Sequence, residues 1–346
     1  MWIQGIWDQE DMWGAIQSYL ATESKDEANM LNYLVMGPWR HSGVNYEGST
    51  LGPLKFEGDT ALQFRRDVLE PFFDQYLTAG APKADTPPVF IYNTGENHWD
   101  RLAKWPLSCA KGCDAVAKPL YLGANFGLSF TAPTSGTAKD ASGFDEYVSD
   151  PAKPVSYLPR PVRFADGAAW QRWLLWDQRM VADRTDVLSY MTPVLTEAVR
   201  ISGAPVVNLV APTSGSDSDW VVKLIDVSPE DVPSQPEMSG YQLPVSMDIF
   251  RGRYRRASRS PRPSPRTRRC PSASSCPRRT TCSFRAIAFW CRGNRAGSRS
   301  TTAIRRRSCP NIFVAKPTDY VKATQRIYHA PGAASFVELP VVPAKQ

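Results

Sequence analysis

The sequence contains few histidines and no long apolar run. Three histidines occur in 346 residues, and two of them, His98 and His329, have no second candidate ligand at metal spacing. No stretch of eighteen consecutive apolar residues is present, although a membrane-spanning helix needs one. A disordered chain is also excluded, because 42% of the residues are hydrophobic and 11% are aromatic. The length therefore predicts a globular protein of about two domains.

One segment lacks the residue types that normally balance arginine. Between Arg251 and Pro310 there are 18 Arg but no Lys, Asp or Glu, and five of the seven cysteines fall there. The whole chain has a formal charge of +7, but without this arginine-rich segment it is acidic. The net charge therefore does not by itself indicate a nucleic-acid partner. Because the segment has neither a 2.0-residue nor a 3.6-residue apolar period, we expect no packed element in it.

Three interpretations of the arginine-rich segment are open: a nucleic-acid-binding arm, a metal site, and translation in the wrong reading frame. Its cysteines lack the paired C-x₂₋₄-C spacing of a zinc site, and it contains no histidine. A basic arm normally mixes Lys with Arg. GC-rich codons that are read one base out of phase give a composition rich in Arg, Ser, Pro, Ala and Cys and free of Lys. We therefore favour a frameshift at about residues 256–309.

The first eighty residues have the element order of a parallel α/β sheet. Met1–Gly5 and Leu31–Gly37 predict two buried strands, and residues 12–22 between them have the apolar spacing of an amphipathic helix. A second helix is predicted over residues 59–79, where Pro71 forces a kink or a new helix start.

The sequence after Pro87 changes to short runs of Val, Ile, Tyr and Thr, separated by Gly, Pro, Asn and Asp. This pattern predicts an all-β sandwich of jelly-roll type. We therefore expect an α/β domain at residues 1–80 and a sandwich domain at residues 87–343, interrupted at about 256–309. The predicted sandwich strands are Val89–Asn93, Lys118–Leu122, Val206–Ala211, Trp220–Val227 and Ala334–Val342.

Acidic and basic side chains follow the two predicted parallel strands. Asp8, Glu10 and Asp11 come after the first strand, and His41 comes after the second. Because active sites of open α/β sheets collect at the carboxyl ends of the strands, Asp8 and His41 are expected to meet there as acid and base. The alternative is a structural histidine and a set of solvated carboxylates, with Asp11 capping the following helix.

The order of these residues matches part of a catalytic triad. In α/β-hydrolases the triad runs Ser, then Asp or Glu, then His, and Asp8 and His41 fit the last two places. No G-x-S-x-G pentapeptide, which carries the serine nucleophile in that fold, occurs in the chain. We therefore expect the nucleophile to precede the first residue.

Two strings of the sequence closely resemble the α-amino acid ester hydrolases. They are G-I-W-D-Q-E-D-M-W-G-A at residues 5–15 and M-G-P-W-R-H-S at residues 36–42. These enzymes are β-lactam antibiotic acylases, within the larger group of cocaine esterase, glutaryl-7-aminocephalosporanic acid acylase and X-Pro dipeptidyl peptidase. Further similar strings lie at residues 71–77, 99–101, 248–255, 311–317 and 320–325, so the resemblance fails only in the arginine-rich segment.

By that resemblance Asp8 is the triad acid, His41 is the base, and Glu10 and Asp11 are two of three carboxylates that hold the substrate's α-ammonium group. Clustered carboxylates repel one another and are relieved by a cation, which agrees with this role. The resemblance implies a serine hydrolase that acts on α-amino acid esters and β-lactam amides through an acyl-enzyme, without cofactor or metal. This chain would be its carboxyl-terminal portion, inactive alone because the nucleophile is absent.

The resemblance also implies a periplasmic or secreted homo-oligomer whose signal peptide would lie before this chain. A disulfide between Cys109 and Cys113 would suit that setting, and two free thiols in a cytosolic protein are the alternative. His98 and His329 are expected to be structural. The competing hypothesis is a β-sandwich binding module with an arginine-rich nucleic-acid arm. We favour the hydrolase with a small-molecule substrate, and expect neither a nucleic-acid nor a membrane partner.

Overall fold

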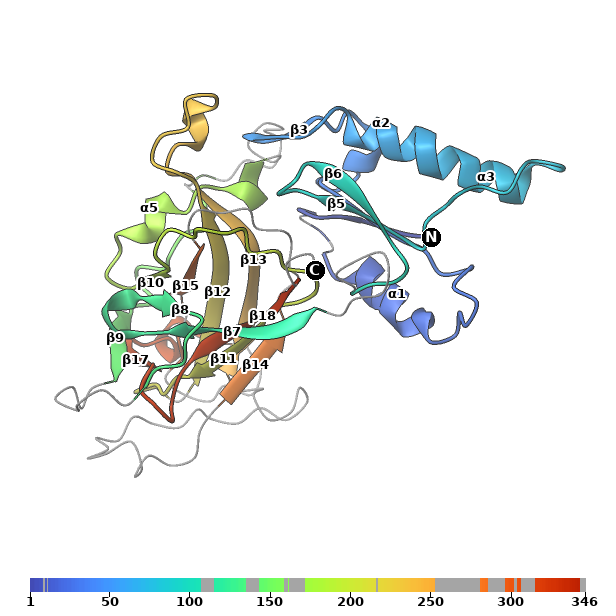
Figure 1. Ribbon diagram of the computed structural model, residues 1–346. Helices are drawn as coiled ribbons and strands as arrows, with labels where there is room; N and C mark the ends of the chain where they lie inside the picture. The colour runs from blue at the N-terminus through green and yellow to red at the C-terminus, as the bar shows by residue number, and fades with distance from the viewer. Residues whose placement is uncertain are drawn as a thin grey trace.

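The computed structural model describes residues 1–8, 10, 12–106, 115–134, 143–158, 161, 172–215, 217–252, 281–285, 296–301, 304–305 and 315–342. These residues form an α/β part and a β-rich part (Figure 1). Asp11, Cys109 and Cys113 lie outside the described residues, as does the disulfide predicted for the two cysteines. None of the helices in the described ranges is both long enough and apolar enough to cross a membrane.

A four-stranded sheet forms the α/β part, in the order β1-β2-β5-β6. β1 (Trp2–Gly5) and β2 (Leu34–Gly37) are parallel, as predicted, and β2 is buried along its whole length. The prediction that β1 is buried is wrong, because β1 is the outer strand of the described sheet and its Trp2 and Ile3 are each 37% exposed. β5 (Val89–Asn93) lies parallel to β2 on its other side, and β6 (His98–Leu102) adds to β5 in the antiparallel direction. The carboxyl ends of β1 and β2 are therefore at the same edge of the sheet.

Helices cover both faces of this sheet, which explains the nearly continuous apolar sequence of its inner strands. Leu34 packs in a core with α1 (Gly14–Glu23), whereas the next residue, Val35, packs in a core with α2 (Thr60–Phe64). Figure 1 shows α1 on one side of the sheet and α2 on the other.

The helix predicted over residues 59–79 forms as three consecutive segments. Asp59 caps α2, because its carboxylate accepts two backbone N–H groups of the first turn. A π-helical segment follows at Arg65–Leu69, and α3 then spans Glu70–Leu77. Pro71 lies in the first turn of α3, and the helical φ and ψ of Leu69 and Glu70 show that the backbone passes from the π segment into α3 without a break. The irregularity expected at this proline is therefore a change of hydrogen-bond pattern within one helical run.

The β-rich part contains two five-stranded sheets that share one core. One sheet has the order β14-β11-β18-β7-β8, and the other has the order β10-β15-β12-β13 with β16 paired to β12. Leu120 and Val207 of the first sheet pack in the same core as Trp220 and Leu224 of the second. Four of the predicted strands are confirmed as β7, β11, β12 and β18.

The remaining elements complete this part of the chain and the loops of the α/β part. Apart from β14, β15 and β16 in the arginine-rich segment, the described strands outside the four-stranded sheet are β3 (Thr50–Leu51), β4 (Leu54–Lys55), β7 (Val116–Leu122), β8 (Leu128–Ser129), β9 (Phe144–Ser149), β10 (Leu188–Met191), β11 (Val206–Val210), β12 (Asp217–Val227), β13 (Gln242–Arg251), β17 (Ala323–Tyr328) and β18 (Phe336–Val341). β9 and β17 form a separate two-stranded sheet, and α5 spans Arg179–Ala182. Short 3₁₀ helices lie at Gly43–Asn45, Ala124–Phe126, Trp173–Leu175, Pro236–Met238 and Pro317–Asp319.

The prediction that Val89–Asn93 is a sandwich strand is wrong. This strand is β5, and it pairs with β2 in the α/β sheet. All five of its residues are buried, because the sheet is covered on both faces. A short apolar run predicts a buried strand, but it does not specify which sheet contains the strand.

The arginine-rich segment contains three strands, contrary to the expectation that it has no packed element. β14 (Thr281–Arg285) pairs with β11, β15 (Ala296–Thr301) lies between β10 and β12, and β16 (Ile304–Arg305) pairs with β12. Backbone pairing with neighbouring strands does not require an apolar period in the added strand. The frameshift remains a prediction that the coding DNA tests.

Candidate active site

The loops after β1 and β2 are held together by backbone hydrogen bonds beyond both strands. The N–H of Ile6 donates to the carbonyl of Gly37 at 2.8 Å, and the N–H of Trp7 donates to the carbonyl of Trp39 at 3.2 Å. The parallel pairing therefore continues into the loops. It brings together the predicted acid and base, which follow these residues in the sequence.

Asp8 and His41 form a direct pair. Nδ1 of His41 lies 3.1 Å from Oδ2 and 3.2 Å from Oδ1 of Asp8. Because an ionised carboxylate only accepts hydrogen bonds, Nδ1 is assigned the proton and Nε2 is the nitrogen that can accept one. The Asp8 side chain is 11% exposed and the His41 side chain is 42% exposed. An imidazole that contacts a buried acid through Nδ1 and remains partly exposed can act as a general base through Nε2.

Glu10 lies on the other side of the imidazole. Its backbone N–H donates to Oδ1 of Asp8 at 2.8 Å, and its Oε2 lies 3.5 Å from Nε2 of His41. The Glu10 side chain is 56% exposed, so its carboxylate can turn toward a ligand. The sequence did not indicate the contact with His41, because side-chain directions in a loop depend on the fold around it. Asp11, the other predicted ammonium-binding carboxylate, lies outside the described residues.

Trp39 fills the space beside the two loops. Its side chain is buried against Phe64 and Trp99, and its Nε1 donates to Oγ1 of Thr60 at 2.9 Å. Gly5 passes so close that a Cβ there would lie 2.7 Å from the carbonyl oxygen of Trp39. Glycine at position 5 therefore permits the close approach of two backbones on which the Asp8 and His41 geometry depends.

Gly5→Ala should separate the two loops. The new methyl group would meet backbone, which cannot rotate away, and such overpacking costs about 1 to 3 kcal/mol. We expect a lower Tm in differential scanning fluorimetry. Gly123→Ala is the matched control, because its added Cβ would have only an ordinary contact at 3.5 Å and its φ of −133° suits any residue. Equal Tm values for the two variants would contradict the requirement for glycine at position 5.

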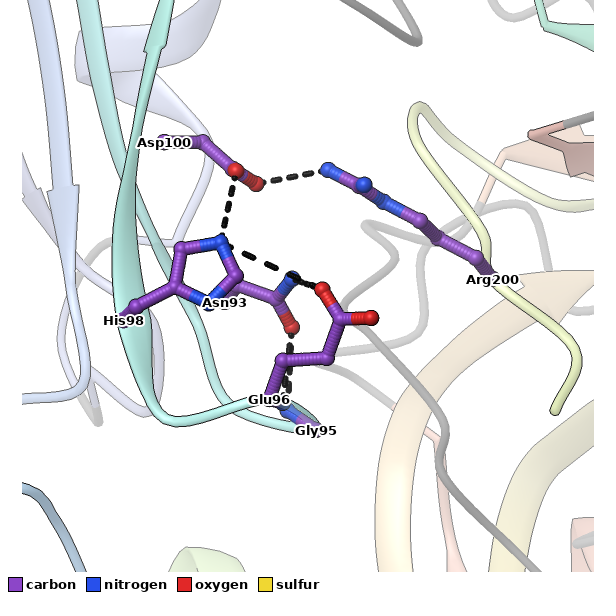
Figure 2. A network of polar contacts seen from close by, with 6 residues as sticks. All are labelled: Asn93, Gly95, Glu96, His98, Asp100 and Arg200. Carbon is purple, nitrogen blue, oxygen red and sulfur yellow. Dashed lines mark hydrogen bonds and ion pairs between the residues drawn. The ribbon is translucent and has the colours of Figure 1, made fainter. Parts of the chain in front are cut away.

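A second histidine takes part in a polar network at the β5–β6 hairpin. Figure 2 shows His98 and Arg200 on the two oxygens of Asp100. Nε2 of His98 lies 3.1 Å from Oδ1 of Asp100, and Nη2 of Arg200 donates to Oδ2 at 2.6 Å. Burial lowers the pKa of Arg200, and the charges of Asp100 and Glu96 oppose that effect. The network joins the edge of the α/β sheet to the loop before β11, so His98 has structural contacts.

The third histidine has a similar environment. Nε2 of His329 lies 3.5 Å from Oδ2 of Asp145, and the same oxygen accepts a hydrogen bond from the hydroxyl of Tyr190 at 2.6 Å. Within the part of the chain that the structure describes, no three His, Cys, Asp or Glu side chains are arranged to hold a metal ion. Asp8, Glu10 and His41 are therefore the candidate site that the described residues offer.

Comparison with known proteins gives matches along the chain. Residues 82–269 match the family described as X-Pro dipeptidyl-peptidase C-terminal non-catalytic domain. Among solved structures, an α-amino acid ester hydrolase is 57% identical with a TM-score of 0.90, over 99% of this chain and 55% of that chain. An aminopeptidase from the marine sediment archaeon Thaumarchaeota archaeon is 38% identical with a TM-score of 0.87, over 99% of this chain and 54% of that chain.

Curated relatives agree with the structural matches. The cocaine esterase of Rhodococcus sp. (strain MB1 Bresler) is 29% identical over 246 residues, which are 70% of this chain and 39% of the esterase. The chain spans about half the length of the two solved relatives, and less of the esterase. The matched relatives do not support the competing hypothesis of a binding module with a nucleic-acid arm.

The parallel sheet, the β-rich part and these relatives define the class: the chain comes from a serine hydrolase family. More closely, it belongs to the α-amino acid ester hydrolases and corresponds to their carboxyl-terminal portion, which contains the X-Pro dipeptidyl-peptidase C-terminal domain. The resemblance inferred from the strings at residues 5–15 and 36–42 is thereby confirmed.

Proposed function

We propose that this chain supplies the acid and the base of a serine hydrolase that cleaves α-amino acid esters and transfers or hydrolyses the acyl groups of β-lactam amides. Asp8 is the triad acid, His41 is the base, and Glu10 with Asp11 binds the substrate's α-ammonium group. The serine nucleophile belongs to the half of the relatives that this chain does not match, so the chain alone should be inactive. The observation that supports this proposal is the 3.1 Å contact between Nδ1 of His41 and Oδ2 of Asp8.

The chemistry would proceed through two proton transfers at one atom. Nε2 of His41 takes the proton of the serine hydroxyl while the serine oxygen attacks the acyl carbon, and it then gives that proton to the departing alcohol or amine. Water hydrolyses the acyl-enzyme in the same way, with the serine oxygen as the leaving group. Asp8 fixes the tautomer of His41 and stabilises the imidazolium that forms in each half-reaction.

Specificity would come from charge beside the base. A substrate α-ammonium near Glu10 gains a charge-assisted hydrogen bond from the Glu10 carboxylate. An otherwise identical acyl group without the nitrogen gains no such bond, and the carboxylate stays hydrogen-bonded to water. The exposure of Glu10 and its 3.5 Å distance from Nε2 of His41 support this role, because the ammonium of a bound substrate lies one carbon away from the reacting acyl carbon.

Glu10→Gln should reduce the preference for α-amino esters. In a complete enzyme, kcat/KM for phenylglycine methyl ester should fall at least about tenfold more than kcat/KM for phenylacetic acid methyl ester. Loss of one charge-assisted hydrogen bond is worth about 1.5 to 3 kcal/mol. The matched control is Glu96→Gln, because Glu96 is 57% exposed and also lies near a histidine, His98. Equal losses for both esters in Glu10→Gln would remove Glu10 from substrate binding.

The proposal includes the architecture and setting expected for the family. The two five-stranded sheets with a shared core support a jelly-roll sandwich as the second domain. The α/β sheet extends through β6, so the expected domain division at residues 80–87 is wrong and the sandwich begins after Leu102. A periplasmic or secreted location and a homo-oligomeric state of the complete protein belong to the same proposal.

A further inference from the structure

Trp7 lies in the loop after β1 and contacts the β-rich part. It directly precedes Asp8 and is 5% exposed. Its backbone N–H donates to the carbonyl of Trp39, in the loop that carries His41, and its indole Nε1 donates to the carbonyl of Pro244 in β13 at 3.5 Å. One side chain therefore contacts the sandwich, while its backbone links the loops of the acid and the base.

The hydrophobic surroundings of Trp7 strengthen this link. Trp7 belongs to a core cluster with Ile6 and Met36 of the α/β part, and Leu243 of β13 packs against the same cluster. The contact with Pro244 is long for a hydrogen bond. The packing of a large, buried indole therefore contributes more to the fixed position of this loop than the hydrogen bond does.

The sandwich strand is irregular at this contact. The register of β12 and β13 shifts at Leu224/Ile225, because Leu224 is opposite Ser246 whereas Ile225 is opposite Pro244. β13 thus has one extra residue, Val245. Bulges of this kind bend a strand and redirect its groups, and they are frequent beside active sites. Here the bulge places Pro244 against Trp7.

We propose that Trp7 is a positioning residue through which the carboxyl-terminal β-sandwich holds Asp8 in line with His41. This inference rests on the proposed function, and it gives a role in positioning the triad acid to a domain that its family description calls non-catalytic. Movement of β13 would shift the indole, and the shift would pass directly to Asp8, the next residue.

The test is the exchange rate of the His41 Nδ1 proton in the chain as it stands. A proton held between imidazole and carboxylate gives a resonance far downfield of the backbone amides in ¹⁵N-histidine-labelled protein. The chain has three histidines, so His98→Gln and His329→Gln assign the signal. Trp7→Phe replaces the indole with a smaller ring, so it removes part of the packing against β13 together with the indole N–H. It should speed exchange with water about fivefold to tenfold or broaden the signal beyond detection, because both losses loosen the loop that carries Asp8.

Two further variants separate positioning from general loss of packing. Trp105→Phe changes a residue of the same cluster with similar burial, 7% exposed, and should leave the exchange rate unchanged. Leu243→Ala alters the cluster from the sandwich side and should speed exchange without changing Trp7 or Asp8. Thermal melts of each variant establish that the proteins are folded.

The outcomes distinguish the two proposals. The positioning role would be overturned if the His41 Nδ1 proton exchanged as slowly in Trp7→Phe and Leu243→Ala as in Trp105→Phe. That result would leave the Asp8 and His41 pair intact. Absence of a downfield His41 signal in the unmodified chain would overturn the pair itself, and with it both proposals. In a complete enzyme, Trp7→Phe should lower kcat about tenfold or more while KM stays within about twofold, because the loss concerns geometry rather than binding.

Discussion

His41→Ala should lower kcat for phenylglycine methyl ester by about 10⁴-fold or more, and Asp8→Asn should lower it by about 10⁴-fold. The enzyme for this measurement is this chain joined to the amino-terminal half of the α-amino acid ester hydrolase that is 57% identical to it. The effects are large because the members of a triad act as a unit, so removal of the base leaves the serine without a proton acceptor. Asp8→Asn also favours the wrong tautomer of His41, because an amide can donate to Nδ1.

Matched variants define what would contradict this expectation. His98→Ala removes another histidine that lies 3.1 Å from a carboxylate, and it should leave kcat within about twofold because His98 is not in the site. The chain alone should hydrolyse neither phenylglycine methyl ester nor a nitrophenyl ester above background. Turnover by the chain alone that His41→Ala abolishes would show that a serine within these residues is the nucleophile.

Asp226→Asn should stabilise the protein, and the gain should grow with pH. Burial in β12 raises the pKa of the Asp226 carboxyl from 3.8 to about 7. Its Oδ1 is buried and has no hydrogen-bond partner among the described residues. The residues opposite it are Ala296 and Leu243. A shift of this size corresponds to roughly 4 kcal/mol of folding free energy lost at high pH.

The direction of the effect follows from proton linkage. The folded state holds the Asp226 proton more tightly than the unfolded chain does, so ionisation of Asp226 lowers the free energy of unfolding. This loss is absent below about pH 4, grows between pH 4 and 7, and is complete above pH 7. Between pH 5 and pH 8 the difference in unfolding free energy between Asp226→Asn and the unmodified chain should increase by roughly 2 to 3 kcal/mol. Asp231→Asn, which changes an exposed carboxylate, is the control. A parallel pH dependence of Tm for both variants would contradict the buried charge.

Local sequence was sufficient for the strands and helices that carry the acid and the base. The apolar runs at residues 1–5 and 31–37, with amphipathic spacing between them, predicted β1, α1 and β2. Burial on both faces holds for β2 alone, because β1 is the outer strand of the described sheet and its Trp2 and Ile3 are exposed. The positions of Asp8 and His41 just after two parallel strands then predicted their pairing. This prediction needed no distant contact, since parallel strands of one sheet end at the same edge.

Tertiary structure alone decided which strands pair and what surrounds the pair. β5 joined the α/β sheet although its sequence fits a sandwich strand, and β14, β15 and β16 formed where no apolar period exists, because strand partners are selected by backbone pairing over long sequence distances. The contact of Trp7 with Pro244 joins residues separated by 237 positions. No local pattern encodes such a contact, because it depends on how the α/β sheet and the sandwich pack together and on the bulge that redirects β13.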